Sequence, residues 1–196
     1  MNYFEVFGLD RKLGIDQAAL QARFYELSRR WHPDYQHAAP PDEQARALEQ
    51  SALVNAAYRA LRDPIARIEY LIRLEEGRET KEGAAVKPQA PPELLEEIFE
   101  LQEMLQDAKA GGLDQASRAR LVAERDALAA RQREESARLT GPLSARWDDA
   151  GPADRRQALD ALKRSLATRA YLRTVIDDLN AALEETQEDH VPHHRH

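Results

Sequence analysis

The chain has 196 residues, of which 32% are charged and only 6% are aromatic, a composition that favours helices over a β-sandwich. A net charge of -7 excludes the basic footprint of a non-specific nucleic-acid binder, and the absence of cysteine excludes disulfides and thiolate metal sites. No run approaches the roughly 18 apolar residues of a membrane span. We therefore expect an all-α cytoplasmic protein without a cofactor, a metal site, or a nucleic-acid or membrane partner.

The first long helix is predicted to end near residue 31. An apolar segment at residues 3–9 precedes it, and this early start leads us to expect no signal or transit peptide. Asp16 is suited to cap the helix at its N-terminus. Its apolar side chains are spaced four, three and four residues apart, which draws one stripe: Leu20, Phe24, Leu27 and Trp31.

Two more helices are predicted in the first half of the chain. One opens at Asp42 and ends at Asp63-Pro64, with a stripe of Ala45, Leu48, Val54, Ala57 and Leu61. The connection to the first helix is short, so the two should form an antiparallel hairpin. The next helix covers residues 65–74, with Ile68, Leu71 and Ile72 facing inward.

A stretch rich in glycine and proline interrupts the helical pattern at residues 77–91 and is predicted to be a linker. Three helical segments follow at about 92–110, 113–147 and 153–186, with a kink or break expected at Thr140-Gly141-Pro142. Short connections favour a three-helix bundle. We expect domains at 1–76 and 92–186, a disordered tail at 187–196, and an L-shaped or elongated molecule.

The tripeptide His32-Pro33-Asp34 is the most informative motif. Pro33 fixes its own φ and pushes His32 out of the α region, so the tripeptide lies on a loop between two helices. Three interpretations compete: a helix stop with solvated side chains, a hydrolase that uses His32 and Asp34 as acid and base, and a recognition site for a protein partner. No nucleophile or phosphate loop accompanies the motif. Three basic residues precede it and suit an acidic partner surface: Arg23, Arg29 and Arg30.

Residues 1–76 resemble the J-domain of the DnaJ superfamily. The resemblance rests on the tripeptide, on the opening Tyr3-Phe4 and Phe7-Gly8-Leu9, and on the run from Asn55 to Pro64. It implies that His32, Pro33 and Asp34 bind a DnaK-type chaperone and trigger its ATPase. Asp34 would accept a charge-assisted hydrogen bond from a chaperone arginine. Tyr35 stands where many J-domains carry lysine.

Residues 93–107 combine six acids with a second apolar patch and contain no lysine or arginine. A core stripe falls within about 80° of the helix circumference: Leu94, Ile98, Leu101, Leu105 and Ala108. Leu95 lies about 100° from the centre of this stripe and Phe99 about 140°. The two side chains either pack in a bundle that wraps the helix on two sides or bind a partner. Tyr171 also points away from the stripe of its own helix.

A J-domain followed by an acidic three-helix bundle resembles the HscB family of iron–sulfur co-chaperones. The resemblance implies an IscU-type scaffold site and delivery of the scaffold to HscA. The implied site residues are Leu95, Glu96, Phe99, Glu100, Glu103, Asp107 and Tyr171. Glu96 departs from the family, which often has methionine there. The protein is thus expected to be a co-chaperone and not an enzyme; the alternative is a general J-domain co-chaperone for other DnaK-type clients.

Overall fold

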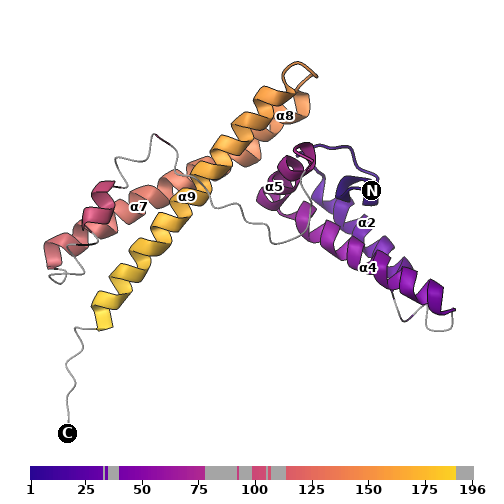
Figure 1. Cartoon of the computed structure of the whole chain (residues 1–196), viewed down its shortest axis with the longest axis horizontal. Helices are drawn as coiled ribbons and strands as arrows, with labels where there is room; N and C mark the ends of the chain where they lie inside the picture. Colours follow the sequence, from indigo (N-terminus) through magenta and orange to yellow (C-terminus); the bar gives the residue numbers. More distant parts are fainter. Residues whose placement is uncertain are drawn as a thin grey trace, which may run out of the picture. The chain divides into compact units, whose positions relative to one another are not determined.

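The computed structural model describes residues 1–32, 34, 40–77, 92, 99–104, 106 and 114–188, and within these ranges it contains helices and no strand. The all-α expectation is therefore confirmed (Figure 1). The helices are α1 (Tyr3–Val6), α2 (Gln17–Arg30), α4 (Pro41–Arg62), α5 (Pro64–Glu75), α7 (Gln115–Arg138), α8 (Ser144–Asp149) and α9 (Arg155–Glu188). A π-helical segment, Leu139–Leu143, joins α7 to α8 at the predicted kink.

The chain forms two compact units. Unit 1 consists of Met1–Ala84 together with Leu139–Leu162, and unit 2 consists of Ala85–Arg138 together with Lys163–His196. The sequence assigned residues 139–162 to the C-terminal bundle, whereas their contacts place them with the N-terminal helices. Helix α9 starts in unit 1 and ends in unit 2. The predicted linker and tail lie almost wholly outside the described residues.

Helix α2 forms as its sequence predicts. The Asp16 side chain accepts hydrogen bonds from the backbone N–H groups of Ala18 and Ala19, which satisfies donors at the helix start. Leu20 is fully buried, while the other members of its stripe are partly buried. The Phe24 ring stacks on Tyr58 of α4 with 4.0 Å between the ring centroids. Helices α2 and α4 thus lie side by side as a hairpin (Figure 1).

The predicted core face of α4 is correct in its second half and wrong in its first. The buried residues are Ala47, Val54, Ala57 and Leu61, which fall within about 80° of one another. Ala45 and Leu48 are exposed because each lies at least about 100° from all four. In the first half of α4 the buried position is the small Ala47. A pattern search that favours large side chains overlooks it.

An acidic side chain of α8 ties the segment 139–162 to the N-terminal loop of unit 1. The Asp148 carboxylate accepts hydrogen bonds from the backbone N–H groups of Leu13 and Gly14, each at 2.7 Å. A Cβ at position 14 would lie 3.0 Å from the carboxylate, so this close approach favours glycine. The neighbouring Trp147 is buried and donates its indole N–H to the Arg11 carbonyl at 3.3 Å.

A buried arginine of α5 completes this polar contact region. Arg67 is only 4% exposed and donates hydrogen bonds to the carbonyls of Leu61, at 2.7 Å, and Leu13. Burial lowers the pKa of Arg67, and the nearby charges of Asp63 and Asp148 oppose that shift. Both backbone polar groups of Leu13 are thus hydrogen-bonded, its N–H to Asp148 and its carbonyl to Arg67.

Aromatic packing joins α1 to α5. The Tyr3 and Tyr70 rings are stacked with 4.4 Å between their centroids, and the Tyr70 hydroxyl accepts a hydrogen bond from the Tyr3 backbone N–H at 2.8 Å. Phe4 packs against the same ring. Burial raises the pKa of Tyr70, although the bond from Tyr3 opposes this shift.

Unit 2 has an aliphatic core. Three stretches of helix contribute to it: residues 99–104, α7 and the second half of α9. The cluster contains Leu101, Leu121, Leu128, Leu172, Val175, Leu179 and Leu183. Leu101 therefore faces inward as predicted, whereas Leu94, Ile98, Leu105 and Ala108 lie outside the described residues. These helical segments share one leucine-rich core, as the predicted helical bundle requires.

Candidate functional surfaces

The loop after α2 presents an acid to solvent. The Asp34 side chain is 85% exposed and the His32 side chain 51%. The backbone N–H of Asp34 donates a hydrogen bond to His32 Nδ1 at 3.2 Å, and Asp34 Oδ2 lies 3.6 Å from the same nitrogen. Pro33 lies outside the described residues. The sequence prediction of an exposed imidazole and carboxylate at this corner is confirmed.

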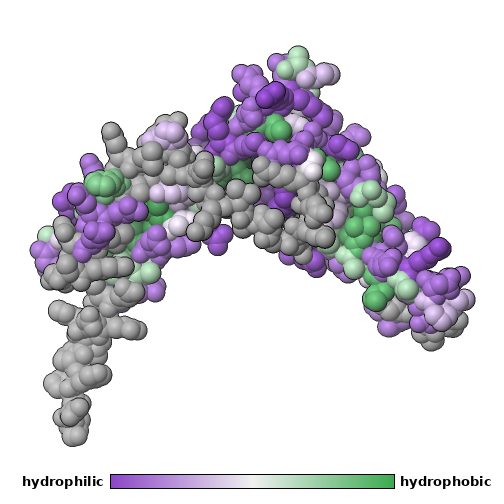
Figure 2. Space-filling view, in the orientation of Figure 1, coloured by the Kyte–Doolittle hydropathy of each residue, from purple (hydrophilic) through white to green (hydrophobic). Residues whose placement is uncertain are grey.

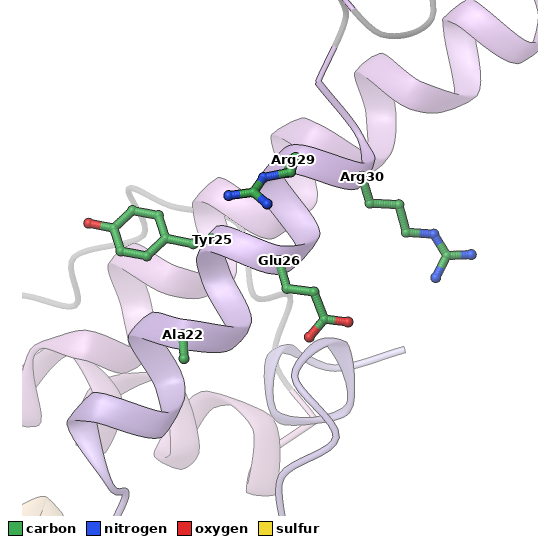
Figure 3. Close-up of a pocket in the computed structure, with 5 residues that line it drawn as sticks. All are labelled: Ala22, Tyr25, Glu26, Arg29 and Arg30. Atoms are coloured by element: carbon green, nitrogen blue, oxygen red, sulfur yellow. The ribbon is translucent and has the colours of Figure 1, made fainter.

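The outer face of α2 carries a surface depression, shown in Figure 3. Its described lining residues are Ala22, Tyr25, Glu26, Arg29 and Arg30. Tyr25 and Arg29 project to one side of the helix, whereas Glu26 and Arg30 project to the other (Figure 3). The helix therefore displays an aromatic ring and three charges on a surface that leads toward the His32–Asp34 corner.

The three arginines predicted to contact a chaperone are all exposed but differ in their surroundings. Arg23 forms an ion pair with Glu26 at 2.7 Å. The Arg30 guanidinium lies over the Trp31 ring, 5.1 Å from its centroid. Arg29 forms no ion pair with any other residue that the structure describes. An exposed ion pair is worth little, so Arg23 can exchange Glu26 for a partner's acid at small cost.

Tyr25 is a surface residue that the sequence reasoning missed. Its side chain is 58% exposed, its hydroxyl accepts a hydrogen bond from Gln21 at 3.3 Å, and its ring lies 5.7 Å from that of Phe24. The position lies about 130° from the centre of the α2 stripe. Its position opposite the core stripe could have been recognised from the sequence, because the same argument from helical phase identified Phe99.

The candidate scaffold surface of unit 2 is described only in part. Phe99 is 64% exposed, and Glu100 and Glu103 are also exposed, whereas the adjacent Leu101 is buried in the core. The prediction that Phe99 points away from the core is confirmed. Tyr171 was predicted to point away from the core stripe of its helix, but it is partly buried and packs against the aliphatic cluster. Leu95, Glu96 and Asp107 lie outside the described residues.

The described surface is mainly hydrophilic on the face shown in Figure 2, with apolar areas of limited extent. Among the described helices, none has the length and apolarity needed to span a bilayer. In the same part of the chain, no three histidine or acidic side chains converge as metal ligands would.

The chain is similar to known proteins along most of its length. A family model described as DnaJ domain matches residues 2–70. The co-chaperone protein HscB homolog of Vibrio cholerae is 37% identical over 144 residues, which is 74% of this chain and 81% of that protein. The corresponding homolog of Azoarcus sp. (strain BH72) is 32% identical over 185 residues, covering 93% and 96%.

Two solved structures resemble the whole chain. Chaperone HscB from Vibrio cholerae aligns with a TM-score of 0.56 at 27% identity, over 97% of this chain and 100% of that one. Human co-chaperone HscB aligns with a TM-score of 0.51 over 92% of this chain and 84% of that one. At 23% identity, the human structure supports the fold alone.

Proposed function

Because the chain belongs to the HscB family of J-domain co-chaperones, we propose that it binds an IscU-type iron–sulfur scaffold and delivers it to an HscA/DnaK-type chaperone whose ATPase it stimulates. Membership makes it a co-chaperone of iron–sulfur cluster assembly. The scaffold, the chaperone and the ATPase stimulation belong to the proposal, as do a cytoplasmic location and the absence of any catalytic activity of its own.

The observation that carries the proposal is the exposed His32–Asp34 corner within the matched DnaJ domain. An exposed carboxylate can accept a bidentate, charge-assisted hydrogen bond from an arginine of the chaperone. His32 supplies a second polar contact, and Pro33 restricts the backbone between them. Exposed cations of α2 then face acidic groups of the partner and increase the association rate: Arg23, Arg29 and Arg30. Tyr25 adds an aromatic surface whose ring loses little conformational entropy on binding.

Asp34→Asn tests the chaperone contact. The substitution keeps the shape of the side chain and removes its charge, so we expect an intact fold and loss of ATPase stimulation. The measurement is steady-state ATP hydrolysis by a purified HscA-type chaperone, with the circular dichroism spectrum as the fold control. Asp10→Asn, at another exposed acid of unit 1, is the matched control and should stimulate normally. Full stimulation by Asp34→Asn would contradict the proposed contact.

Phe99 is proposed as the apolar anchor for the scaffold, together with Leu95. The acids Glu96, Glu100, Glu103 and Asp107 would steer and orient a basic scaffold surface rather than add raw affinity, and Tyr171 would border the patch. An exposed phenylalanine is consistent with this role, because its burial by a partner yields roughly 1.5–3 kcal/mol. The aliphatic core beneath it does not need the ring for its own packing.

The scaffold contact is tested with the double variant Leu95→Ala and Phe99→Ala in the full chain. We expect scaffold binding to weaken by about 150-fold or more, with little change in melting temperature. Calorimetric titration with purified IscU-type scaffold measures the affinity, and Leu48→Ala is a control at an exposed apolar side chain in unit 1. Absence of scaffold binding by the wild-type chain would instead favour a general J-domain co-chaperone for other clients.

A further inference from the structure

We propose that His32 is a positioning residue: its Nδ1 atom accepts the Asp34 backbone N–H and thereby holds the turn that presents the Asp34 carboxylate. The inference rests on the proposed chaperone contact and adds a second role to the imidazole. We assign the polar contact with the chaperone to the outer part of the ring, which carries Nε2. The positioning role uses Nδ1, the nitrogen nearer the backbone.

The hydrogen bond has the spacing of a helix N-cap bond. An N-cap side chain accepts a hydrogen bond from the backbone N–H two or three residues later, and the next residue is often proline. His32 Nδ1 lies 3.2 Å from the N–H donor of Asp34, two residues later, and proline stands between them in the sequence. The backbone at Asp34 is helical, while that at His32 is not. The imidazole therefore occupies the place that asparagine or serine usually fills.

The hydrogen bond also specifies the chemical form of the ring. A nitrogen that accepts a hydrogen bond carries no proton, so the neutral imidazole must hold its proton on Nε2. In that tautomer Nδ1 accepts the hydrogen bond from the Asp34 backbone, and Nε2 carries the N–H donor of the ring. A protonated Nδ1 would instead face Asp34 Oδ2, 3.6 Å away, and would compete with the chaperone arginine for the carboxylate.

Three substitutions separate the two roles of His32. In His32→Asn, Oδ1 is bonded to Cγ just as Nδ1 is, so the cap is kept while the outer part of the ring is lost. In His32→Gln, the acceptor moves one bond farther from the backbone. In His32→Ala, both the acceptor and the ring are lost. A role limited to direct contact predicts that asparagine performs no better than alanine.

The experiment measures stimulation of a purified HscA-type chaperone by the full chain across a range of co-chaperone concentrations. We expect His32→Ala and His32→Gln to need roughly fivefold more protein for half-maximal stimulation, the scale of a lost N-cap bond. His32→Asn should fall between His32→Ala and the wild type, because it keeps the acceptor and loses only the outer part of the ring. Asparagine as poor as alanine would overturn the positioning role, because the retained acceptor would then have no effect.

A measurement on the wild-type chain alone tests the tautomer. Two-bond ¹⁵N–¹H correlation spectra of the labelled full chain should show His32 Nδ1 without a proton and Nε2 with one. A protonated Nδ1 in the neutral ring would overturn the inference. If Asp34→Asn stimulates normally, the proposed chaperone contact itself fails. If Asp34→Asn is inactive and His32→Asn matches His32→Ala, only the positioning role fails.

Discussion

The two units reach a packed core by different means. In unit 1, Arg67 donates a hydrogen bond to the Leu13 carbonyl, and the Asp148 carboxylate accepts one from the Leu13 N–H. The Tyr70 hydroxyl accepts a hydrogen bond from the backbone N–H of Tyr3. The core of unit 2 is a cluster of leucines and one valine. Directional bonds define one geometry, whereas aliphatic packing tolerates shifts among similar side chains.

The contrast matches what each unit presents to solvent. Unit 1 exposes a polar corner, whose proposed hydrogen bonds to a chaperone would require an accurate orientation of Asp34. Unit 2 exposes the Phe99 ring among acids, and an apolar contact is less sensitive to small displacements. A hydrogen-bonded core suits the first task and a leucine core is sufficient for the second.

The sequence supplies a probe that distinguishes the two units. The chain has two tryptophans, Trp31 and Trp147, and both belong to unit 1. Tryptophan fluorescence therefore follows unfolding of unit 1, whereas far-ultraviolet circular dichroism follows the helices of both units. Urea unfolding of each variant, followed by both fluorescence and circular dichroism, therefore separates effects on unit 1 from effects on the whole chain.

The largest effect is expected for Arg67→Leu. The substitution leaves the buried carbonyls of Leu13 and Leu61 without their donor and removes the cation near Asp148, which should lower the free energy of unfolding by about 4 kcal/mol. The fluorescence transition should shift strongly. Arg46→Leu changes an exposed arginine of α4 and is the control. If Arg67→Leu lowers the free energy of unfolding by less than the truncation of a buried leucine, about 3 kcal/mol, polar bonds do not dominate the stability of unit 1.

Leu179→Ala should have the next largest effect. Leu179 is fully buried in the leucine cluster, so the cavity should lower the free energy of unfolding by about 3 kcal/mol. We expect the circular dichroism transition to move and the fluorescence transition to move less. Equal shifts of both signals would mean that the two cores unfold together, which would weaken the contrast between them.

Tyr70→Phe should cost about 1 kcal/mol, because the Tyr3 backbone N–H loses its acceptor. The substitution should also change the dependence of stability on pH. The raised pKa of Tyr70 means that the folded state holds the phenol proton more tightly than the unfolded chain. This stability is present below about pH 10 and is lost as the pH rises through the folded-state pKa.

Unfolding of the Tyr70→Phe variant, followed by fluorescence between pH 8 and 11, measures this effect. The variant should show a shallower loss of stability above about pH 10 than the wild type. Tyr25→Phe removes an exposed phenol of the same unit and should leave the slope unchanged. Identical slopes in the wild type and Tyr70→Phe would exclude Tyr70 as the source.

The smallest effect is expected for Phe99→Ala. The ring is mostly exposed, so the free energy of unfolding should change by less than about 0.5 kcal/mol. Leu101→Ala, two residues later on the buried side, should instead cost about 3 kcal/mol. A comparable loss at both positions would place Phe99 in the core and remove the basis for a scaffold surface.

Local features of the fold were predictable from the sequence because they depend on spacing along one helix. The inward face of α5 and the outward position of Phe99 follow from helical phase, and the cap at Asp16 follows from the preference for aspartate at a helix start. Thr140-Gly141-Pro142 marked the site where the structure changes to a π-helical segment. The exposure of His32 and Asp34 followed from the effect of Pro33 on its neighbour.

The long-range polar contacts were not predictable in the same way. Asp148 and Leu13 are 135 residues apart, and neither position departs from the pattern of its own segment. Periodicity shows which face of a helix is buried, but it does not show which other segment covers that face. This is why residues 139–162 were assigned to the bundle and why the partner of Arg67 was not foreseen.

The two-part composition of unit 1 has a consequence for biosynthesis. A nascent chain that has emerged only as far as residue 84 lacks Trp147 and Asp148, so the loop at Leu13 and Gly14 has no carboxylate to bind. At ordinary translation rates of about 5–20 residues per second, that carboxylate leaves the ribosome several seconds later. The corner that would engage the chaperone is thus translated first, and the contacts of α8 with the same unit form only after α8 has emerged.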